Sequence, residues 1–340
     1  MKSKLTLSII LIFVFCFSGF ALFAEGEKAE EERAIIGKPG EGIIIYAQMG
    51  GSPGKPCTDP RVLGAKAAAE QWGCKLIQQF SDWQSDVMIT QFKEAIAARP
   101  DGIIIMGHPG EDAFRPFVDE AVSKGIIVTS NNTPLPGLES KYVGKGFGYV
   151  GLDLYKAGHM LASQVIMMAG LKRGDKVFNY GLKAQPTRGL IDIGIEDRCK
   201  EVGINLDYVE ISEEVNADAS LAIPVVTGYL SANPDCKAMI IFHGILTSIA
   251  AEMITAAGLD PDDIFFGGCD LGPKTIEAIR AGYVDVIIDQ QIYLQGFIPI
   301  EQICLTKLYK LSGLNINTGS GFVTPDNIES IIPLIEKGIR

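Results

Sequence analysis

Short apolar runs alternate with longer amphipathic runs along this chain from residue 41 onward. The apolar runs are mostly continuous, which is typical of strands that are buried on both faces of a sheet. The predicted strands lie at residues 42–50, 75–80, 101–107, 125–132, 176–181, 206–211, 237–244, 263–270 and 285–291.

The amphipathic runs between these strands predict helices. They lie at residues 62–72, 86–98, 113–124, 156–169, 191–202, 220–232, 247–257 and 273–281. Several end in a glycine directly before the next strand, as in "AEQWG", "AVSKG" and "AIRAG", which is the expected left-handed helix cap. Strict alternation of strand and helix predicts βαβ units and parallel sheets covered on both faces. Because like positions recur in both halves, we predict an α/β fold of two doubly wound lobes.

Polar side chains follow many of the predicted strands. In open parallel sheets, ligands bind outside the carboxyl ends of the strands. The candidates are Gln48, Asp82, Trp83, His108, Asn131, Asn132, residues 185–188, His243, Asp270 and residues 289–291. Amides, carboxylates and arginine pair with hydroxyl groups, and an aromatic face packs on the C–H side of a sugar. The set therefore suits a small polyhydroxylated ligand.

The first 24 residues have the pattern of a secretory signal peptide. Lys2 and Lys4 precede the apolar run 9–17, and the small-residue context "ALFA" ends at Ala24. We expect cleavage near Ala24 and a periplasmic mature protein. A membrane anchor fits less well, because the run is short for a span of ~20 residues and no basic cluster follows it. Cys16 lacks the small residues that a lipidation site needs before it.

Charge and length limit the function classes. The 340-residue chain has a formal net charge of -11, and removal of the two leader lysines makes it more acidic. An acidic chain without a basic block argues against nucleic acid or an anionic membrane surface as partner. The residues after position 24 predict two domains of ~150 residues each.

No pattern in the chain marks a catalytic, metal or cofactor site. The six cysteines after residue 24 are widely spaced, without CxxC or a Cys/His cluster, so we expect most to be buried small hydrophobes and leave one disulfide open. The chain contains no GxSxG, HExxH or P-loop, and "GKGFG" at 144–148 lacks the strand and the Ser/Thr of a phosphate loop. We therefore expect neither an enzyme nor a metalloprotein.

Four segments, in order, resemble a known family: "RPDGIIIMGHP", "GIIVTSNN", "YVGLDLYKAGHMLA" and "GGCDLGPKTIEAIRAGYVDVIIDQQIYLQGF". They are similar to periplasmic sugar-binding proteins of the ribose-binding, type I superfamily, the extracytoplasmic receptors of ATP-driven importers. The resemblance implies an N-terminal lobe of residues 41–152 plus 290–320 and a C-terminal lobe of 153–289 plus 321–340. It also implies three crossings, near Leu152, Gln290 and Phe322, and a hinge that closes on the ligand.

Three residues match ligand positions of that family: Asn132, Asp270 and Gln290. A simpler interpretation makes Asp270 a helix N-cap and Asn132 a turn residue. Arg188 matches the family's sugar-binding arginine in one register, whereas another register places Ile191 there. Asp289 and Gln291, on the opposite side of the strand from Gln290, are expected to hold the crossing segments together.

Two positions depart from the family pattern. The aromatic pair that sandwiches the sugar falls near Cys57 and Thr58, so stacking must come from Trp83, Phe147 or Tyr293. The Asn/Asp expected after "MIIF" is replaced by His243, which is either a ligand contact or a strand-end residue satisfied by backbone.

Taken together, these features predict a monomeric receptor that binds a monosaccharide between its lobes and delivers it to the membrane permease of an ABC importer. The expected ligand-binding residues are Asn132, Asp270, Gln290, Arg188, Trp83, His243, Asn131, Gln48 and Phe147. Alternatives are a receptor for a polyol or a furanosyl signalling molecule linked to chemotaxis, and an exported hydrolase. A repressor effector domain shares the two-lobed core, but the leader and the missing DNA-binding module argue against it.

Overall fold

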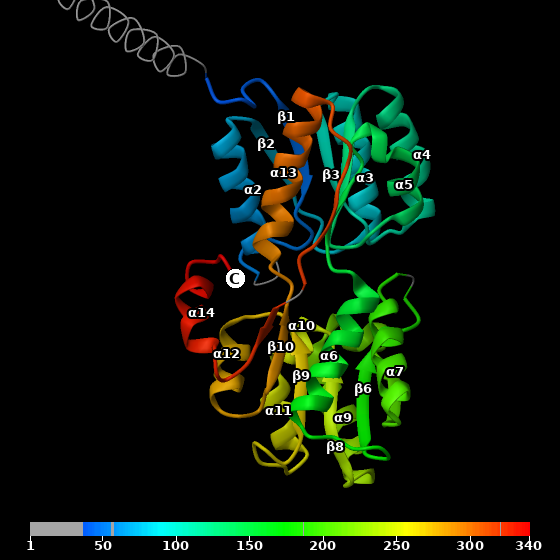
Figure 1. Ribbon diagram of the computed structural model, residues 1–340, viewed down its shortest axis with the longest axis vertical. Coiled ribbons are helices and arrows are strands. Elements are labelled where there is room, and N and C mark those ends of the chain that lie inside the picture. The colour runs from blue at the N-terminus through cyan, green and yellow to red at the C-terminus, as the bar shows by residue number, and fades with distance from the viewer. Residues whose placement is uncertain (1–36, 56–57, 186, 320) are drawn as a thin grey trace, which may run out of the picture.

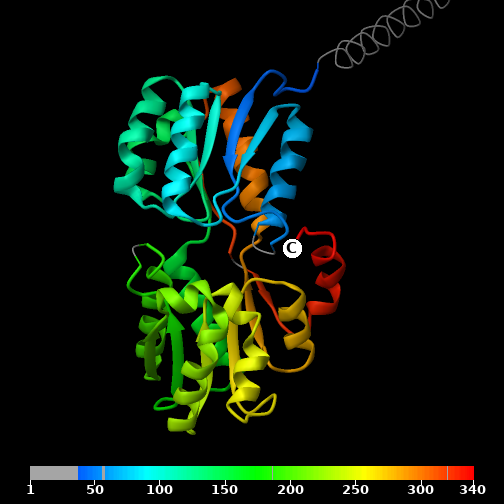
Figure 2. The same ribbon diagram turned by 180° about the vertical axis from the view of Figure 1, so that it is seen from behind.

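The computed structural model describes residues 37–55, 58–185, 187–319 and 321–340. Two α/β lobes, each built on a six-stranded sheet, are stacked along the long axis of the molecule (Figure 1). Helices cover both faces of each sheet, as the view from behind also shows (Figure 2). The predicted leader, residues 1–24, and Cys57 lie outside the described residues.

The first lobe has the strand order β11-β5-β4-β3-β1-β2, and every strand pair is parallel. Its elements are β1 (Ile44–Gln48), α2 (Asp59–Trp72), β2 (Lys75–Gln79), α3 (Ser85–Ala98), β3 (Gly102–Met106), α4 (Glu111–Ser123), β4 (Ile127–Asn131), α5 (Pro136–Tyr142), η1 (Val143–Lys145), β5 (Tyr149–Gly151), and, after the chain returns, α13 (Ile292–Tyr309) and β11 (Asn315–Asn317).

The second lobe has the order β12-β10-β9-β8-β6-β7. Its elements are α6 (Leu154–Met168), β6 (Lys176–Gly181), α7 (Leu190–Val202), β7 (Asn205–Glu210), α8 (Glu213–Ala217), η2 (Ala219–Leu221), α9 (Ala222–Ala232), β8 (Cys236–Ile241), α10 (Gly244–Thr247), α11 (Ala250–Ala256), β9 (Phe265–Cys269), α12 (Pro273–Arg280), β10 (Val286–Asp289), β12 (Gly321–Val323) and α14 (Ile328–Ile335).

One strand departs from the expected parallel arrangement. β12 runs antiparallel to β10. The chain re-enters the second lobe from the side at which β10 ends, so a strand that continues into the lobe runs opposite to β10. Elsewhere the two-lobed α/β prediction is confirmed, and the same strand plan is used in both lobes.

The same helix contact also occurs in both lobes. A Cβ on Gly64 of α2 would overlap the carbonyl oxygen of Tyr293, and one on Gly296 of α13 would overlap that of Arg61. In the second lobe, a Cβ on Gly158 of α6 would overlap the carbonyl oxygen of Ile191 of α7, and one on Gly194 of α7 would overlap that of Tyr155 of α6. Each lobe therefore carries a pair of helices that cross with their backbones in contact.

Four hydrophobic clusters form the core, two in each lobe. The strands β3 and β4 are buried over their whole length, which matches their continuous apolar sequence. The predicted helix at 247–257 is shorter in the structure. It is α11 alone, which begins at Ala250 because Ile249 has the non-helical φ of -111° and ψ of 19°, and the short helix α10 precedes it.

Candidate functional site

Gln295, in the first turn of α13, is the centre of a hydrogen-bond network where the chain passes between the lobes. The side chain is fully buried. Its Nε2 donates to the carbonyl oxygen of Gln290 over 3.3 Å and to Thr318 Oγ1 over 3.2 Å. Its Oε1 accepts from Arg61 Nη2 and from Asn132 Nδ2, each over 3.1 Å. One amide thus joins two crossing segments to the end of β4 and to α2.

Asp270 and Gln290 meet at the carboxyl ends of the neighbouring strands β9 and β10. Gln290 Nε2 donates to Asp270 Oδ1 over 2.5 Å. Asp270 does not cap the helix that follows, since the N-cap of α12 is Gly272 and no side chain caps it. Asp270 has the left-handed φ of 66°. Its position is therefore explained better by the strand-end site than by helix capping.

Backbone strain gathers at these strand ends. Six of the non-glycine residues with positive φ directly follow a strand or lie in the loop after it: Asp82, Trp83, Asn132, Thr187, Asp270 and Gln291. This conformation is uncommon for residues other than glycine, although Asn and Asp tolerate it best. Such strain is found most often at sites where side chains must be aimed in a set direction.

Arg188 affects titratable groups in both lobes. Burial, and then the Arg188 and Arg61 charges, lower the pKa of His108, which follows β3, to about 3. Burial and then the Arg188 charge lower the pKa of His243, which follows β8, to about 4. A charge felt in both lobes lies between them. Ile191, the alternative register, is buried in a hydrophobic cluster, so Arg188 stays the predicted contact.

His243 has a side-chain partner, so it is more than a strand-end histidine satisfied by backbone. Its Nε2 lies 2.9 Å from Asn216 Oδ1. The lowered pKa keeps the imidazole neutral at pH 7, so Nε2 carries the proton and Nδ1 is an acceptor. Nδ1 is buried and has no hydrogen-bond partner among the described residues. A ligand hydroxyl could donate to it.

Trp83 is half-exposed, with 37% of its surface accessible. The centroids of the Trp83 and His108 rings are 5.2 Å apart. The guanidinium carbon of Arg61 lies 5.8 Å from the centroid of the Trp83 ring. A Cβ on Gly50 or Gly51 would stand 2.6 Å from an indole atom. The two glycines thus let the ring lie against the loop after β1, where it stays partly exposed instead of joining the core.

Comparison with known proteins gives the family. The periplasmic binding protein domain family matches residues 62–305, which is more than half of the chain. This chain is a periplasmic binding protein. Members of the family are extracytoplasmic, non-catalytic solute-binding proteins, so the expectation that the chain is not an enzyme is confirmed, as is the stated resemblance.

Three relatives of this periplasmic binding protein are informative. The xylose/arabinose-binding protein XylF of Sulfolobus acidocaldarius is 29% identical over 257 residues, which are 71% of this chain and 61% of that protein. A solute-binding protein of Burkholderia graminis, solved with D-arabinose, has a TM-score of 0.74 at 19% identity and covers 86% of this chain and 98% of its own. GanP, a glucose-galactose binding protein of Geobacillus stearothermophilus, has a TM-score of 0.73 at 23% identity, with 85% and 99% covered.

The match to the curated relative is partial: the periplasmic binding protein described here spans 61% of that relative's length. The two solved structures share less than a quarter of their residues with it and therefore show the fold alone.

The structure contradicts two of the expected contacts. Gln48 is fully buried, and its Nε2 donates to the Met88 carbonyl over 2.7 Å while its Oε1 accepts from the Met106 amide over 3.0 Å. Phe147 is 1% exposed and belongs to the same hydrophobic cluster as Phe92. Both side chains are used inside the first lobe, so neither is available to a ligand.

Asn131 and Asn132 have different surroundings although they are adjacent. Asn131 is fully buried; its Nδ2 donates to the Gln295 carbonyl over 3.3 Å, and its Oδ1 has no partner within the described part of the chain. Asn132 is partly exposed and bonded to the Gln295 side chain. Tyr293 is partly buried and stacks on Phe297 at 6.0 Å between ring centroids. Asn132 is therefore the more accessible of the two asparagines and stays the predicted ligand contact.

Gln291 links two crossing segments, as expected. Its Nε2 donates to the Thr318 carbonyl over 2.8 Å. Asp289 accepts from the Gln291 amide over 2.9 Å and forms a 3.1 Å ion pair with Arg340 at the end of the chain.

Arg61 and Gln295 were not predicted as site residues. Arg61 is fully buried on α2, and its Nη1 donates to the Met49 carbonyl over 2.9 Å. The available signal was an arginine in the first turn of a helix, directly after the "DP" start and before the apolar residues 62–65. Thr58 is also buried at this place, and its Oγ1 has no partner within the described ranges.

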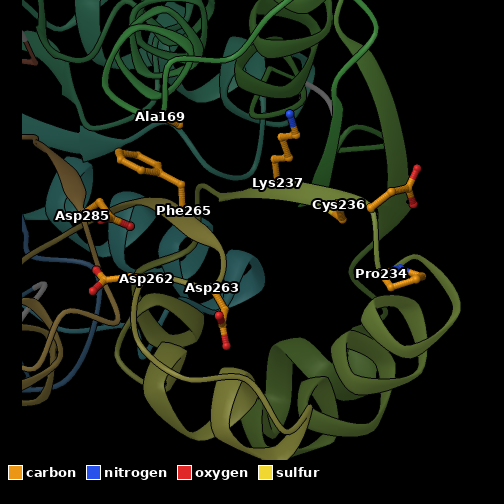
Figure 3. Close-up of a pocket in the computed structure, with 9 residues that line it drawn as sticks. Ala169, Pro234, Cys236, Lys237, Asp262, Asp263, Phe265 and Asp285 are labelled. Carbon is orange, nitrogen blue, oxygen red and sulfur yellow. The ribbon is translucent and has the colours of Figure 1, made fainter.

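Other features lie away from this site. A cavity of about 440 Å³ lies at the amino ends of β8 and β9, among Lys237, Phe265 and Asp285, at the opposite end of the second sheet (Figure 3). Among the described residues, no group of three or more His, Cys, Asp and Glu could hold a metal ion, and no helix is long and apolar enough to cross a membrane.

Proposed function

We propose that this periplasmic binding protein is an extracytoplasmic receptor that binds a monosaccharide between its lobes and delivers it to the permease of an ABC importer. The observation that supports the proposal is that Gln290 bonds to Asp270 and shares the partner Gln295 with Asn132. The Arg188 charge also acts on His108 and on His243, one histidine of each lobe. Trp83, which is 37% exposed, lies beside His108 and Arg61 and offers an aromatic face. Such a mixture of charged, amide and aromatic groups matches the hydroxyls and the C–H face of a sugar.

The hydrogen-bonding groups favour a ligand that both donates and accepts. The Asp270 carboxylate and His243 Nδ1 accept hydrogen bonds, whereas the Arg188 guanidinium only donates. The amides of Asn132 and Gln290 do both. A neutral polyhydroxylated molecule offers both roles at each hydroxyl, which an apolar or purely cationic solute does not.

The names of two relatives suggest where to begin. One relative is called a xylose/arabinose-binding protein and one solved structure contains D-arabinose. We therefore propose an aldopentose as the first ligand to test, with hexoses and polyols beside it.

We further propose that the units of closure are residues 41–152 with 290–320 and residues 153–289 with 321–340. A ligand that contacts both units only when they are closed stabilises that state by its differential affinity. The protein acts as a monomer, and the closed shape is what the permease recognises.

A thermal-shift screen of pentoses, hexoses and polyols tests the proposal. A ligand that binds only the folded protein stabilises it by mass action and so raises the melting temperature. At a ligand concentration of 100 times the dissociation constant, the stabilisation is about 2.7 kcal/mol. Asp270→Asn should lose most of the shift. Glu277→Gln, which removes an exposed carboxylate from the helix after Asp270, should keep it. If no sugar or polyol shifts the melting temperature and the protein turns over a sugar, the proposal is wrong.

A further inference from the structure

Two cysteine thiols lie in contact in the core of the first lobe. Cys74, directly before β2, is 9% exposed, and Cys304, on α13, is fully buried in the same hydrophobic cluster. The hydrogen bond between the two thiols is the largest influence on both: it lowers the pKa of Cys74 and raises the pKa of Cys304.

The helix packing explains why these thiols meet. α2 and α13 cross in backbone contact at Gly64 and Gly296. Eight residues beyond these glycines, which is about two turns, lie Trp72 and Cys304. A Cβ on Gly40 would stand 2.9 Å from the Trp72 carbonyl oxygen and 3.4 Å from Cys304 Sγ. This independent neighbour places the Cys304 sulfur beside the end of α2.

The backbone fixes Cys74 in the same place. Gly73 ends α2 in the left-handed conformation, with φ 78°. The Cys74 amide donates back to the Ala69 carbonyl over 3.1 Å, and the Gly73 amide donates to the same oxygen over 2.8 Å. The side chain of Cys74 is therefore held against α13 by a capped helix end and by the start of β2, not by a loose loop.

We propose that Cys74 and Cys304 form a disulfide in the exported protein. Neither thiol is in a disulfide in the structure, but members of this family work outside the cytoplasm, where thiol pairs in contact are oxidised. Cys199 and Cys236 are also buried, and burial is the main influence that raises the pKa of each. The proposal does not depend on the identity of the ligand.

The chemistry is exchange with an oxidised disulfide, supplied by a dithiol–disulfide oxidoreductase outside the cytoplasm or by oxidised glutathione in vitro. The Cys74 thiolate attacks one sulfur of that disulfide and displaces the other as a thiolate. Cys304 then loses its proton, attacks Cys74 Sγ and releases the second sulfur. Two protein thiols are oxidised, and the reagent disulfide is reduced to two thiols. The two released thiolates take up the protons lost by Cys74 and Cys304.

The bond would link α13, which enters the first lobe after the second crossing, to the start of β2. It closes a loop from residue 74 to residue 304 that contains the second lobe up to β10. A link across so long a loop restricts the unfolded chain strongly. It would hold the returning helix in the first lobe.

Peptide mapping by mass spectrometry, without reduction and after alkylation, tests the proposal on the wild-type protein exported to an oxidising compartment. The expected result is a linked pair of peptides that contain Cys74 and Cys304. If both peptides are fully alkylated, also after incubation with oxidised glutathione, or if either cysteine is linked to Cys57 instead, the proposal is overturned. This measurement needs no variant to fold.

Thermal unfolding gives the second readout. Reduction should lower the melting temperature of the wild type by about 5 °C or more. Cys304→Ala should show no effect of reductant, whereas Cys199→Ala, which removes a buried thiol outside the pair, should keep the wild-type difference. Equal responses of the two variants would overturn the proposal.

Discussion

At the scale of single residues, the site depends on protonation states that burial fixes. His243 is 7% exposed, and its neutral form presents one donor to Asn216 and one bare acceptor. A histidine at this position therefore makes the contact dependent on pH, whereas a contact made by an asparagine would not depend on pH.

The pH dependence of stability follows from this burial. Burial, with the Arg188 charge adding to it, lowers the pKa of His243 to about 4, whereas the unfolded chain titrates near 6.5. Between these values the unfolded state binds the proton and the folded state does not. Stability is therefore intact above about pH 6.5 and is lost as the pH falls toward 4, by roughly 3 kcal/mol.

Urea unfolding of wild type and His243→Gln at pH 7.5 and 4.5 measures this effect. The glutamine can still bond to Asn216 but does not titrate. The variant should lose less stability than the wild type between the two pH values, while His108 contributes equally to both proteins. The same loss in both would show that His243 does not titrate on unfolding.

At the scale of elements, α13 carries two buried glutamines that make different contacts. Gln295 bonds to Gln290, Thr318, Arg61 and Asn132 at the site end. Gln302, two turns later, bonds to Thr129 and to the Leu314 carbonyl inside the lobe. The first is placed to orient ligand contacts, and the second is not.

Gln295→Leu should therefore change two properties. Loss of four hydrogen bonds, one from a buried guanidinium, should destabilise the protein by about 3 kcal/mol. Affinity for the sugar that gives a thermal shift should also fall, by about tenfold, because Asn132 and Gln290 lose their common partner. Gln302→Leu is the matched control: it should lower stability in urea and leave the calorimetric dissociation constant unchanged. An equal loss of affinity in both would contradict this role.

The helix crossings make a second prediction at this scale. Gly64→Ala should destabilise the protein by about 1–3 kcal/mol, because the added methyl group meets the carbonyl of Tyr293. Gly228→Ala in α9 is the control. Gly228 is exposed, a Cβ there has no heavy atom within 4 Å, and its φ is not positive, so alanine should stabilise by about 0.5–1 kcal/mol. If the wild type and Gly64→Ala have equal denaturation midpoints in urea, α2 and α13 do not cross as closely as described.

At the scale of the whole molecule, three short crossings join the two lobes, and we expect closing to be their main relative motion. Their sheets are separate, and the crossings join β5 to α6, β10 to α13 and β11 to β12. A ligand that binds groups from both lobes, such as Asn132 and Asp270, therefore couples its affinity to closure.

Small-angle X-ray scattering can measure this closure. Saturating sugar should decrease the radius of gyration of the wild type. Asp270→Asn at the same sugar concentration should keep the unliganded value, since it lacks the second-lobe contact. An unchanged radius in the wild type at saturation would mean that binding does not close the lobes.

The sequence by itself determined the architecture. Continuous apolar runs such as "DGIIIMG", with glycine-capped helices between them, can only be buried in parallel sheets, so local pattern was enough for two α/β lobes. The strand-end rule also indicated Trp83, His108, His243, Asp270 and Gln290, because it depends only on where apolar runs stop.

Only the tertiary structure decided which of the strand-end polar residues are buried inside a lobe. Gln48 and Asn131 also end strands, but both are buried, and two backbone groups of other elements occupy Gln48. Phe147 was absorbed by a hydrophobic cluster. Conversely, Arg61 and Gln295 reach the site from helices that are far apart in the sequence. Strand periodicity shows where a side chain leaves the sheet, whereas its partners come from elements that only folding brings together.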